Sequence, residues 1–182
     1  MKIKMMLLLL LGLFVFACKD KEKAVEEKKP FANCKCGRPT PIFNQNIPEF
    51  VSGHNFAITS DAGVEIITYN DGTKLQIVQT GCNDIRQEFS FIYSDQSVKA
   101  LSDSDWVQKA IDEFKKIGNS APDYQPFALW GNAIASRKEE FHIGEDKEME
   151  KGFFMKIDRI VSAAETTMIV TVYADDCPGL KK

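Results

Sequence analysis

A change in the spacing of apolar residues divides this chain and limits what it can fold into. From Gln87 to Ser94, apolar and polar residues alternate, which is the pattern of a half-buried strand. From Val107 to Ile117, apolar residues recur at the spacing of an amphipathic helix. Phe153–Val161 and Thr166–Tyr173 are again rich in β-branched and aromatic residues, and we expect them to form a hairpin. The chain therefore runs from strands through helix to strands.

More strands are predicted before the helix. Val64–Tyr69 and Thr73–Thr80 flank Asn70-Asp71-Gly72, which is a signal of a hairpin turn. Phe56–Thr59 is a shorter candidate strand. Consecutive strands with short connections form an antiparallel meander. The residues that we expect on one face of the later strands are Leu75, Ile77, Phe89, Phe91 and Tyr93.

The central helix carries signals at both ends. Ser102 followed by Asp105 resembles a capping box, and Gly118 stands where a left-handed C-cap residue is expected. Helical spacing recurs from Phe127 to Phe141, although Gly131 weakens this second helix. The region from Gly144 to Gly152 is predicted to be a charged turn. These elements favour a two-layer α+β fold, in which one or two helices pack on one face of an antiparallel sheet.

The first 17 residues form a separate unit. Lys2 and Lys4 precede an apolar run from Leu7 to Phe16, which is short for a membrane span, and the small residue Ala17 follows. A charged start, an apolar middle and a small residue at the end are typical of a secretory signal. The run Val15-Phe16-Ala17-Cys18 also resembles the lipobox of bacterial lipoproteins.

The lipobox resemblance implies an acylated protein. Cleavage before Cys18 would leave its thiol carrying diacylglycerol and its amino group acylated, with palmitate as the expected fatty acid. Two or more chains hold a protein firmly to a bilayer. The expected location is then the outer membrane of the cell envelope, on its periplasmic or surface face. The alternative is an ordinary secretory signal cut near Ala17, with Cys18 as a free thiol.

Residues 18–33 are predicted to be a flexible linker, since the stretch after Cys18 alternates in charge and has few bulky apolar residues. Its start, Cys18-Lys19-Asp20, also resembles the surface-export signals of flavobacterial lipoproteins; a plain spacer is the other interpretation. Residues 34–182 are long enough for one globular domain with its own core. No family resemblance is recognised for this domain.

Four further cysteines lie in the domain: Cys34, Cys36, Cys82 and Cys177. An even number in an exported domain suggests two disulfides. A bond between Cys34 and Cys36 would close a strained small ring, so the two remaining pairings each join one of them to Cys82 and the other to Cys177. The spacing does not match a structural zinc site.

The net charge and the motifs of the chain limit the classes of function that we expect. The 23 Lys and Arg against 26 Asp and Glu argue against a nucleic-acid partner. The two histidines, His54 in a predicted loop and His142, lack a catalytic or metal-binding motif around them. We therefore predict no catalytic residues, no metal and no cofactor.

The expected function is a non-enzymatic binding domain, anchored to the membrane by lipid, with an envelope protein or glycan as partner. Trp106, Phe153 and Phe154 are its candidate binding-patch residues: Trp106, at the edge of its helix's buried stripe, would lie beside whichever of the two adjacent phenylalanines is exposed. Cover of the sheet by a second helix is the other interpretation of these residues. The alternative is an envelope hydrolase using His54 or His142 with nearby acids.

Overall fold

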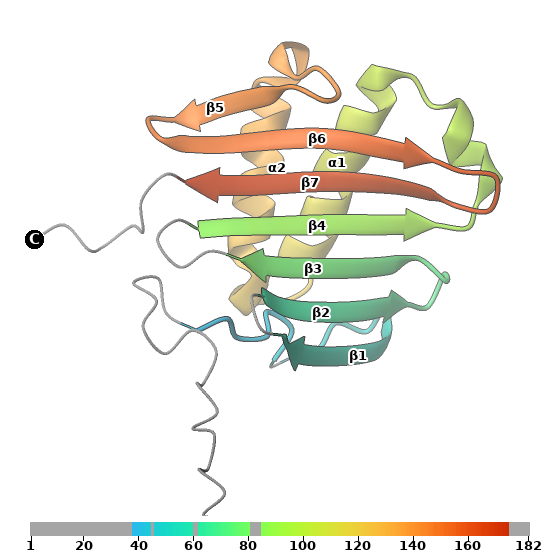
Figure 1. Ribbon diagram of the computed structural model, residues 1–182, viewed down its shortest axis with the longest axis vertical. Coiled ribbons are helices and arrows are strands. Elements are labelled where there is room, and N and C mark those ends of the chain that lie inside the picture. The colour runs from blue at the N-terminus through green and yellow to red at the C-terminus, as the bar shows by residue number, and fades with distance from the viewer. Residues whose placement is uncertain (1–37, 45, 60–61, 81–84, 175–182) are drawn as a thin grey trace, which may run out of the picture.

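The computed structural model describes residues 38–44, 46–59, 62–80 and 85–174. These residues form one seven-stranded sheet in the order β1-β2-β3-β4-β7-β6-β5, and every neighbouring pair is antiparallel (Figure 1). The strands are β1 (Val51–Ile58), β2 (Ala62–Tyr69), β3 (Lys74–Thr80), β4 (Ile85–Tyr93), β5 (Asp146–Glu150), β6 (Phe153–Val161) and β7 (Thr166–Ala174).

Two α-helices cover one face of this sheet (Figure 1). They are α1 (Asp103–Gly118) and α2 (Gln125–Ser136), and short 3₁₀ turns lie at Gln96–Ala100, Pro122–Tyr124 and Lys138–Glu140. The predicted two-layer α+β fold is therefore confirmed. The predicted meander is present as β2, β3 and β4, and the predicted hairpin as β6 and β7. β7, the last strand in the chain, pairs with β4 and β6 and therefore lies inside the sheet, not at its edge.

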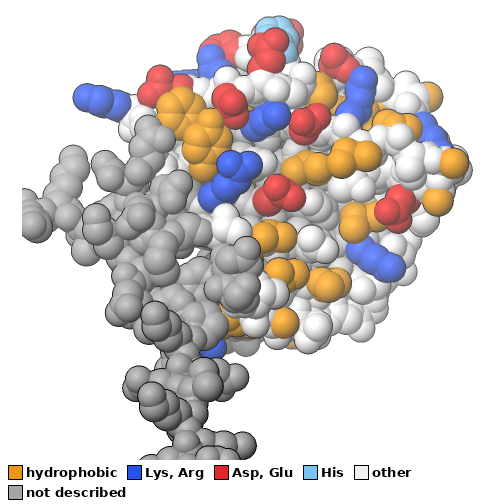
Figure 2. Space-filling view, viewed as in Figure 1, with side chains coloured by type: hydrophobic (Ala, Val, Ile, Leu, Met, Phe, Trp, Pro, Cys, Tyr) orange, Lys and Arg blue, Asp and Glu red, His pale blue; other side chains and the backbone are white. Residues whose placement is uncertain are grey.

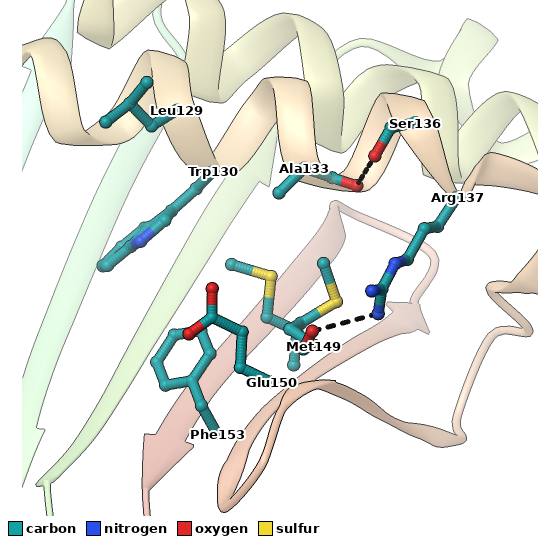
Figure 3. Close-up of a pocket in the computed structure, with 9 residues that line it drawn as sticks. Leu129, Trp130, Ala133, Ser136, Arg137, Met149, Glu150 and Phe153 are labelled. Carbon is teal, nitrogen blue, oxygen red and sulfur yellow. Dashed lines mark hydrogen bonds between the residues drawn. The ribbon is translucent and has the colours of Figure 1, made fainter.

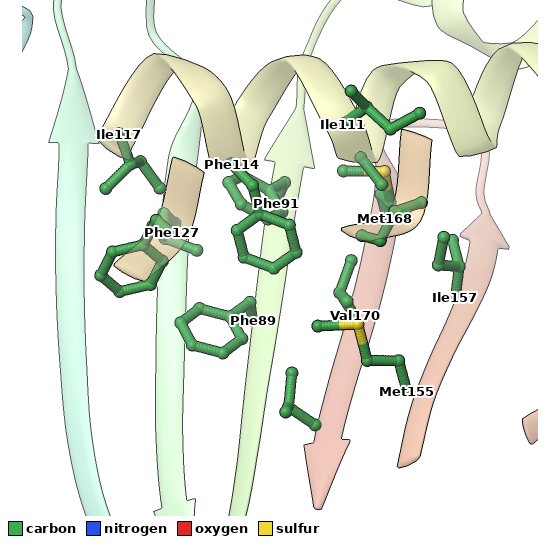
Figure 4. Packing of buried hydrophobic residues seen from close by; sticks show 14 of the residues in the cluster. Phe89, Phe91, Ile111, Phe114, Ile117, Phe127, Met155, Ile157, Met168 and Val170 are labelled. Carbon is green, nitrogen blue, oxygen red and sulfur yellow. The ribbon is translucent and has the colours of Figure 1, made fainter. Parts of the chain in front are cut away.

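The core lies between the sheet and the helices (Figure 4). Phe114 of α1 packs against Phe89 of β4 and Phe127 of α2, with ring centroids 5.5 and 6.2 Å apart. The inward residues expected from the alternation in β3 and β4 are all buried. Ser102 and Asp105 form the predicted capping box of α1. Periodicity and capping thus placed the central helix and strands correctly.

Gly118 has another role than the predicted one. The helix ends in right-handed backbone at Asn119, and Gly118 is not among the residues with positive φ. A Cβ at Gly118 would lie only 2.1 Å from the backbone nitrogen of Ala128, and one at Gly131 would lie 3.1 Å from the carbonyl oxygen of Ile111. Both glycines therefore let α1 and α2 approach closely, and Gly131 is compatible with α2 for this reason.

Two element boundaries differ from the sequence prediction, and one strand was not predicted. β1 begins at Val51, before the expected start, and α2 ends at Ser136 rather than reaching Phe141. The predicted charged turn contains the edge strand β5, because Met149 is buried there among exposed charged neighbours. A strand with one neighbour tolerates charged residues on its outer side, so its composition resembled that of a turn.

The other face of the sheet has no helix over it among the described residues (Figure 2). It mixes apolar and charged side chains, and Ile66 and Ile160 are among its exposed apolar residues. Phe154 and Tyr173 stack there with centroids 5.1 Å apart. The signal, the linker and all five cysteines lie outside the described residues. No described helix is both long enough and apolar enough to cross a membrane.

Candidate functional site

A groove lies between α2 and the hairpin formed by β5 and β6 (Figure 3). Its volume is about 510 Å³, which is within the range of ligand-binding pockets. Six of its nine lining residues are apolar, among them two aromatic rings and two thioethers, and the other three are polar or charged. The lining residues are Leu129, Trp130, Ala133, Ser136, Arg137, Met149, Glu150, Phe153 and Met155.

Trp130 forms a rigid wall of the groove. Its ring makes edge contacts with Phe89, Phe114 and Phe127, at centroid distances of 5.8, 5.8 and 5.4 Å. The side chain is nevertheless only half-buried, and the neighbouring Leu129 is 59% exposed. An aromatic ring held in place by the core and still open to solvent is suited to receive an apolar group with little loss of entropy.

Local structure explains how these residues meet. Trp130, Ala133 and Arg137 are spaced three and four residues apart, so they lie on one side of α2 and its C-cap. On the hairpin, the pairing of β5 with β6 shifts register between Glu148 and Glu150, and Glu150 lies opposite Phe153. Because of this irregularity, residues 149, 150 and 153 all reach the groove.

The polar groups of the groove differ in how they are engaged. Nη1 of Arg137 donates to the carbonyl oxygens of Glu148 and Met149, at 3.2 and 3.0 Å, and so joins the end of α2 to β5. Oγ of Ser136 donates to the carbonyl of Ala133 at 2.9 Å. The exposed carboxylate of Glu150 has no hydrogen bond or ion pair with any described residue. Figure 3 shows this carboxylate above the Phe153 ring, on the side facing Trp130.

A second polar cluster surrounds Glu65, which is fully buried on β2. Its carboxylate accepts hydrogen bonds from the backbone N–H groups of Ile42 and Phe43, at 2.7 and 2.8 Å. It also accepts one of 2.6 Å from Nε2 of His54, which lies in strand β1 and not in the expected loop. Three donors compensate the burial of this carboxylate and fasten the N-terminal loop (residues 38–44 and 46–50) to the sheet.

The Glu65 cluster has part of the geometry of a catalytic site. A histidine oriented by a carboxylate is the arrangement that activates a serine or cysteine nucleophile. The nearby Ser52 hydroxyl instead donates to the carbonyl of Thr68 at 3.1 Å. Among the described residues, no hydroxyl or thiol is bonded to His54. The observed bonds support a structural role, and they leave one ring nitrogen of His54 without a described partner.

A third cluster lies under α1. Glu113 is buried and accepts a hydrogen bond of 3.1 Å from the Tyr93 hydroxyl. Burial raises the pKa of Glu113, although Lys109 and Lys116 oppose this effect. Burial and the carboxylate of Glu113 likewise raise the pKa of Tyr69 and Tyr93. Oε2 of Glu113 and the Tyr69 hydroxyl have no hydrogen-bond partner in the described structure, so no hydrogen bond offsets the burial of these two atoms.

The predicted patch of Trp106, Phe153 and Phe154 is wrong as a single surface. Trp106 is completely buried, because it lies on the sheet side of α1 with its ring 6.3 Å from that of Tyr93. Phe153 and Phe154 point to opposite faces of the sheet, as adjacent strand residues must. Only Phe153 lines the groove.

Other predicted site residues are apart from the groove. His142 is exposed, and its side chain has no described hydrogen bond or ion pair. Cys18, Cys34, Cys36, Cys82 and Cys177 lie outside the described residues, so their lipidation and pairing remain predictions. In the described ranges, no three His, Cys, Asp or Glu side chains gather as a metal site.

Sequence reasoning missed most of the groove. One available signal was Leu129, an apolar residue outside the stripe formed by Phe127, Trp130 and Ile134. Another signal was the strand-like alternation in 146–150, where Lys147 and Met149 lie between acidic residues. The high charge of this segment makes that alternation hard to recognise. The contact between α2 and β5 is long-range and has no signature in local spacing.

Comparison with known proteins does not assign a family: no protein-family model, no curated protein and no solved structure matches this chain.

Proposed function

We propose that this chain is a lipid-anchored envelope protein whose globular domain binds a partner without catalysing a reaction, through the groove between α2 and the β5–β6 hairpin. The lipid anchor rests on the Val15–Cys18 pattern of the sequence. The binding role rests on the half-exposed Trp130 ring, held by three core rings at the side of a groove of about 510 Å³.

The groove favours binding over chemistry. Most of its lining residues are apolar, and its hydroxyl and guanidinium groups donate to backbone carbonyls of the same protein. The flexible side chains of Met149 and Met155 can adapt to different apolar partners. Such a lining provides contact area and orientation, whereas a hydrolytic site would need a nucleophile and a base within hydrogen-bond distance.

Site-specific photocrosslinking tests the proposal in the full-length protein within its native envelope. A photoreactive residue at Ser136, which is exposed and lines the groove, should give one discrete crosslinked partner. The same residue at Ile160, on the open face of the sheet, is the control. The substitution Leu129→Lys should abolish the Ser136 product because it places a charge on the groove wall. Equal labelling from both positions would contradict the proposal.

A second candidate function is the envelope hydrolase, favoured by the 2.6 Å bond between His54 and the buried Glu65. It predicts hydrolysis of peptidoglycan, peptide or glycan substrates by the purified protein. The activity should disappear in His54→Ala while the fold, measured by circular dichroism, persists. Turnover that survives this substitution would remove His54 from the candidate mechanism.

A further inference from the structure

We infer that the groove binds a peptide segment in which a bulky apolar side chain lies next to lysine or arginine. This inference rests on the proposed function and specifies the chemistry of the partner. The apolar part follows from the lining described above, and the basic part follows from the charges on the hairpin side of the groove.

Carboxylates outnumber basic groups in the segment that runs from the C-cap of α2 through β5. Residues 137–151 contain six Asp and Glu against four Lys and Arg. Three of the four basic groups have partners within the domain: Arg137 bonds to two carbonyls, Lys138 donates to Gln108 at 3.1 Å, and Lys147 forms an ion pair with Glu140. This segment therefore carries two more acidic than basic side chains, and most of its basic groups are already engaged.

Fewer of the carboxylates than of the basic groups form hydrogen bonds or ion pairs within the domain. Glu139, Glu145, Asp146 and Glu150 have no hydrogen bond or ion pair from their side chains within the described structure. Glu150 is the one that lines the groove itself, beside Phe153 and Trp130 (Figure 3). An apolar side chain against these rings would place a neighbouring cation close to the Glu150 carboxylate, where the aromatic faces also favour positive charge.

The alternatives fit less well. An anionic ligand would meet the Glu150 carboxylate, and the Arg137 guanidinium that could compensate it is directed toward the carbonyls of β5. A purely apolar ligand would leave Glu150 partly desolvated without a partner, which is unfavourable. A basic segment with an apolar anchor satisfies both parts of the lining.

The two tryptophans provide a direct measurement. Trp106 is fully buried and Trp130 is partly exposed in the groove, so quenching of fluorescence by acrylamide reports mainly Trp130. Three synthetic peptides share a Leu-Phe centre and differ in their flanking residues, which are Lys, Gln or Glu. We expect the Lys-flanked peptide to protect Trp130 from acrylamide and to bind at least about tenfold more tightly than the Glu-flanked one at low salt.

Two substitutions separate the parts of the inference. Glu150→Gln should weaken the Lys-flanked peptide about fivefold and leave the Gln-flanked peptide unchanged, since only one exposed charge pair is lost. Glu165→Gln, an exposed carboxylate between β6 and β7, is the matched control and should have no effect. Rising salt should reduce the preference for Lys flanks. Leu129→Lys should prevent binding of the Lys-flanked peptide.

The outcomes distinguish the inference from the proposed function. If all three peptides protect Trp130 equally and Glu150→Gln changes nothing, the groove binds apolar segments and the basic requirement is wrong. If no peptide protects Trp130 at millimolar concentration, both the inference and the binding role of the groove are wrong. The sequence of the chain itself includes an apolar residue next to lysines, at Leu180, Lys181 and Lys182. If the Lys-flanked peptide binds only after these three residues are replaced by Ser, the occupant of the groove is the chain's own segment and not a partner.

Discussion

His54 on β1 donates a hydrogen bond of 2.6 Å to Glu65 on β2, whose carboxylate is completely buried. The same carboxylate accepts from the backbone of Ile42 and Phe43. The contact therefore links the edge strand, its neighbour and the N-terminal loop. That loop continues to Thr40, whose carbonyl accepts from the side chain of Gln79 at 2.8 Å.

Replacing Glu65 should destabilise the protein more than replacing His54. Glu65→Ala leaves two buried backbone N–H groups without an acceptor and is expected to lower the free energy of unfolding by about 2–5 kcal/mol. His54→Ala leaves the backbone bonds in place and should cost about 1–3 kcal/mol. Urea unfolding measures both. Glu49→Ala, at an exposed position of the same loop, is the control. Equal losses for Glu65→Ala and Glu49→Ala would contradict this role.

Glu113 should make stability depend on pH. Because burial raises its pKa in the folded protein above the ordinary 4.5, the folded state holds the proton in a pH range where the unfolded state has released it. Stability contributed by this group is therefore highest at acid pH and falls as the pH rises from about 4.5 through the raised pKa.

The substitution Glu113→Gln tests that dependence. Gln keeps an acceptor for the Tyr93 hydroxyl and carries no charge, so this variant should gain stability relative to the native protein as the pH rises from 4 to 8. Unfolding by urea across this range provides the comparison, and Glu139→Gln, at an exposed site, should follow the native curve. A constant difference between Glu113→Gln and the native protein would rule out a raised pKa.

Gly118 and Gly131 should respond differently to alanine. At Gly118 a Cβ meets backbone atoms of Ala128 at 2.1 and 2.6 Å, which only separation of the helices can relieve. The loss should exceed about 2 kcal/mol, despite the gain of up to about 1 kcal/mol in helix propensity. At Gly131 the nearest contacts are Cγ of Lys115 at 3.0 Å and the carbonyl oxygen of Ile111 at 3.1 Å, so the overlap is less severe and the loss should be smaller. Thermal unfolding ranks the two variants, and the reverse order would contradict this packing.

Acylation should depend on Cys18 alone. Metabolic labelling with palmitate should mark the mature protein, and Cys18→Ser should abolish both the label and sedimentation with membranes. Cys82→Ser, examined in parallel, should retain the label. A native protein with a free thiol at Cys18 would favour the ordinary secretory signal instead.

The four remaining cysteines should be joined in two disulfides. Each lies within a few residues of a described segment at one end of the sheet, since Thr40 bonds to Gln79 and Ile85 pairs with Ala174. Mass spectrometry of peptides from the unreduced protein should find Cys34 and Cys36 each linked to Cys82 or Cys177. Four free thiols, or a bond between Cys34 and Cys36, would contradict the predicted pairings.

Local pattern predicted the elements whose own residues determine them. The alternation around Phe89 and Phe91 and the spacing around Phe114 depend on burial of one face, so they can be recognised without knowing what covers that face. The Ser102–Asp105 capping box depends on residues three apart and was predicted for the same reason. The prediction failed where the role or burial of a residue depends on a residue far away in the sequence. Gly118 is explained by Ala128 on another helix, and Trp106 is buried by packing that its own segment does not specify.

The succession of strands and helices, the α+β class and the expectation of an exported, anchored chain could be predicted, because each depends on residues close together along the chain. Long-range packing alone brings Glu65 to both His54 and the N-terminal loop, and brings Trp130 and Glu150 to one groove. These residues lie on different elements. The Glu65 contacts follow from the pairing of β1 with β2 and the loop before them, and the groove follows from how β5 and β6 pack beside α2. Both arrangements are set by burial over the whole domain.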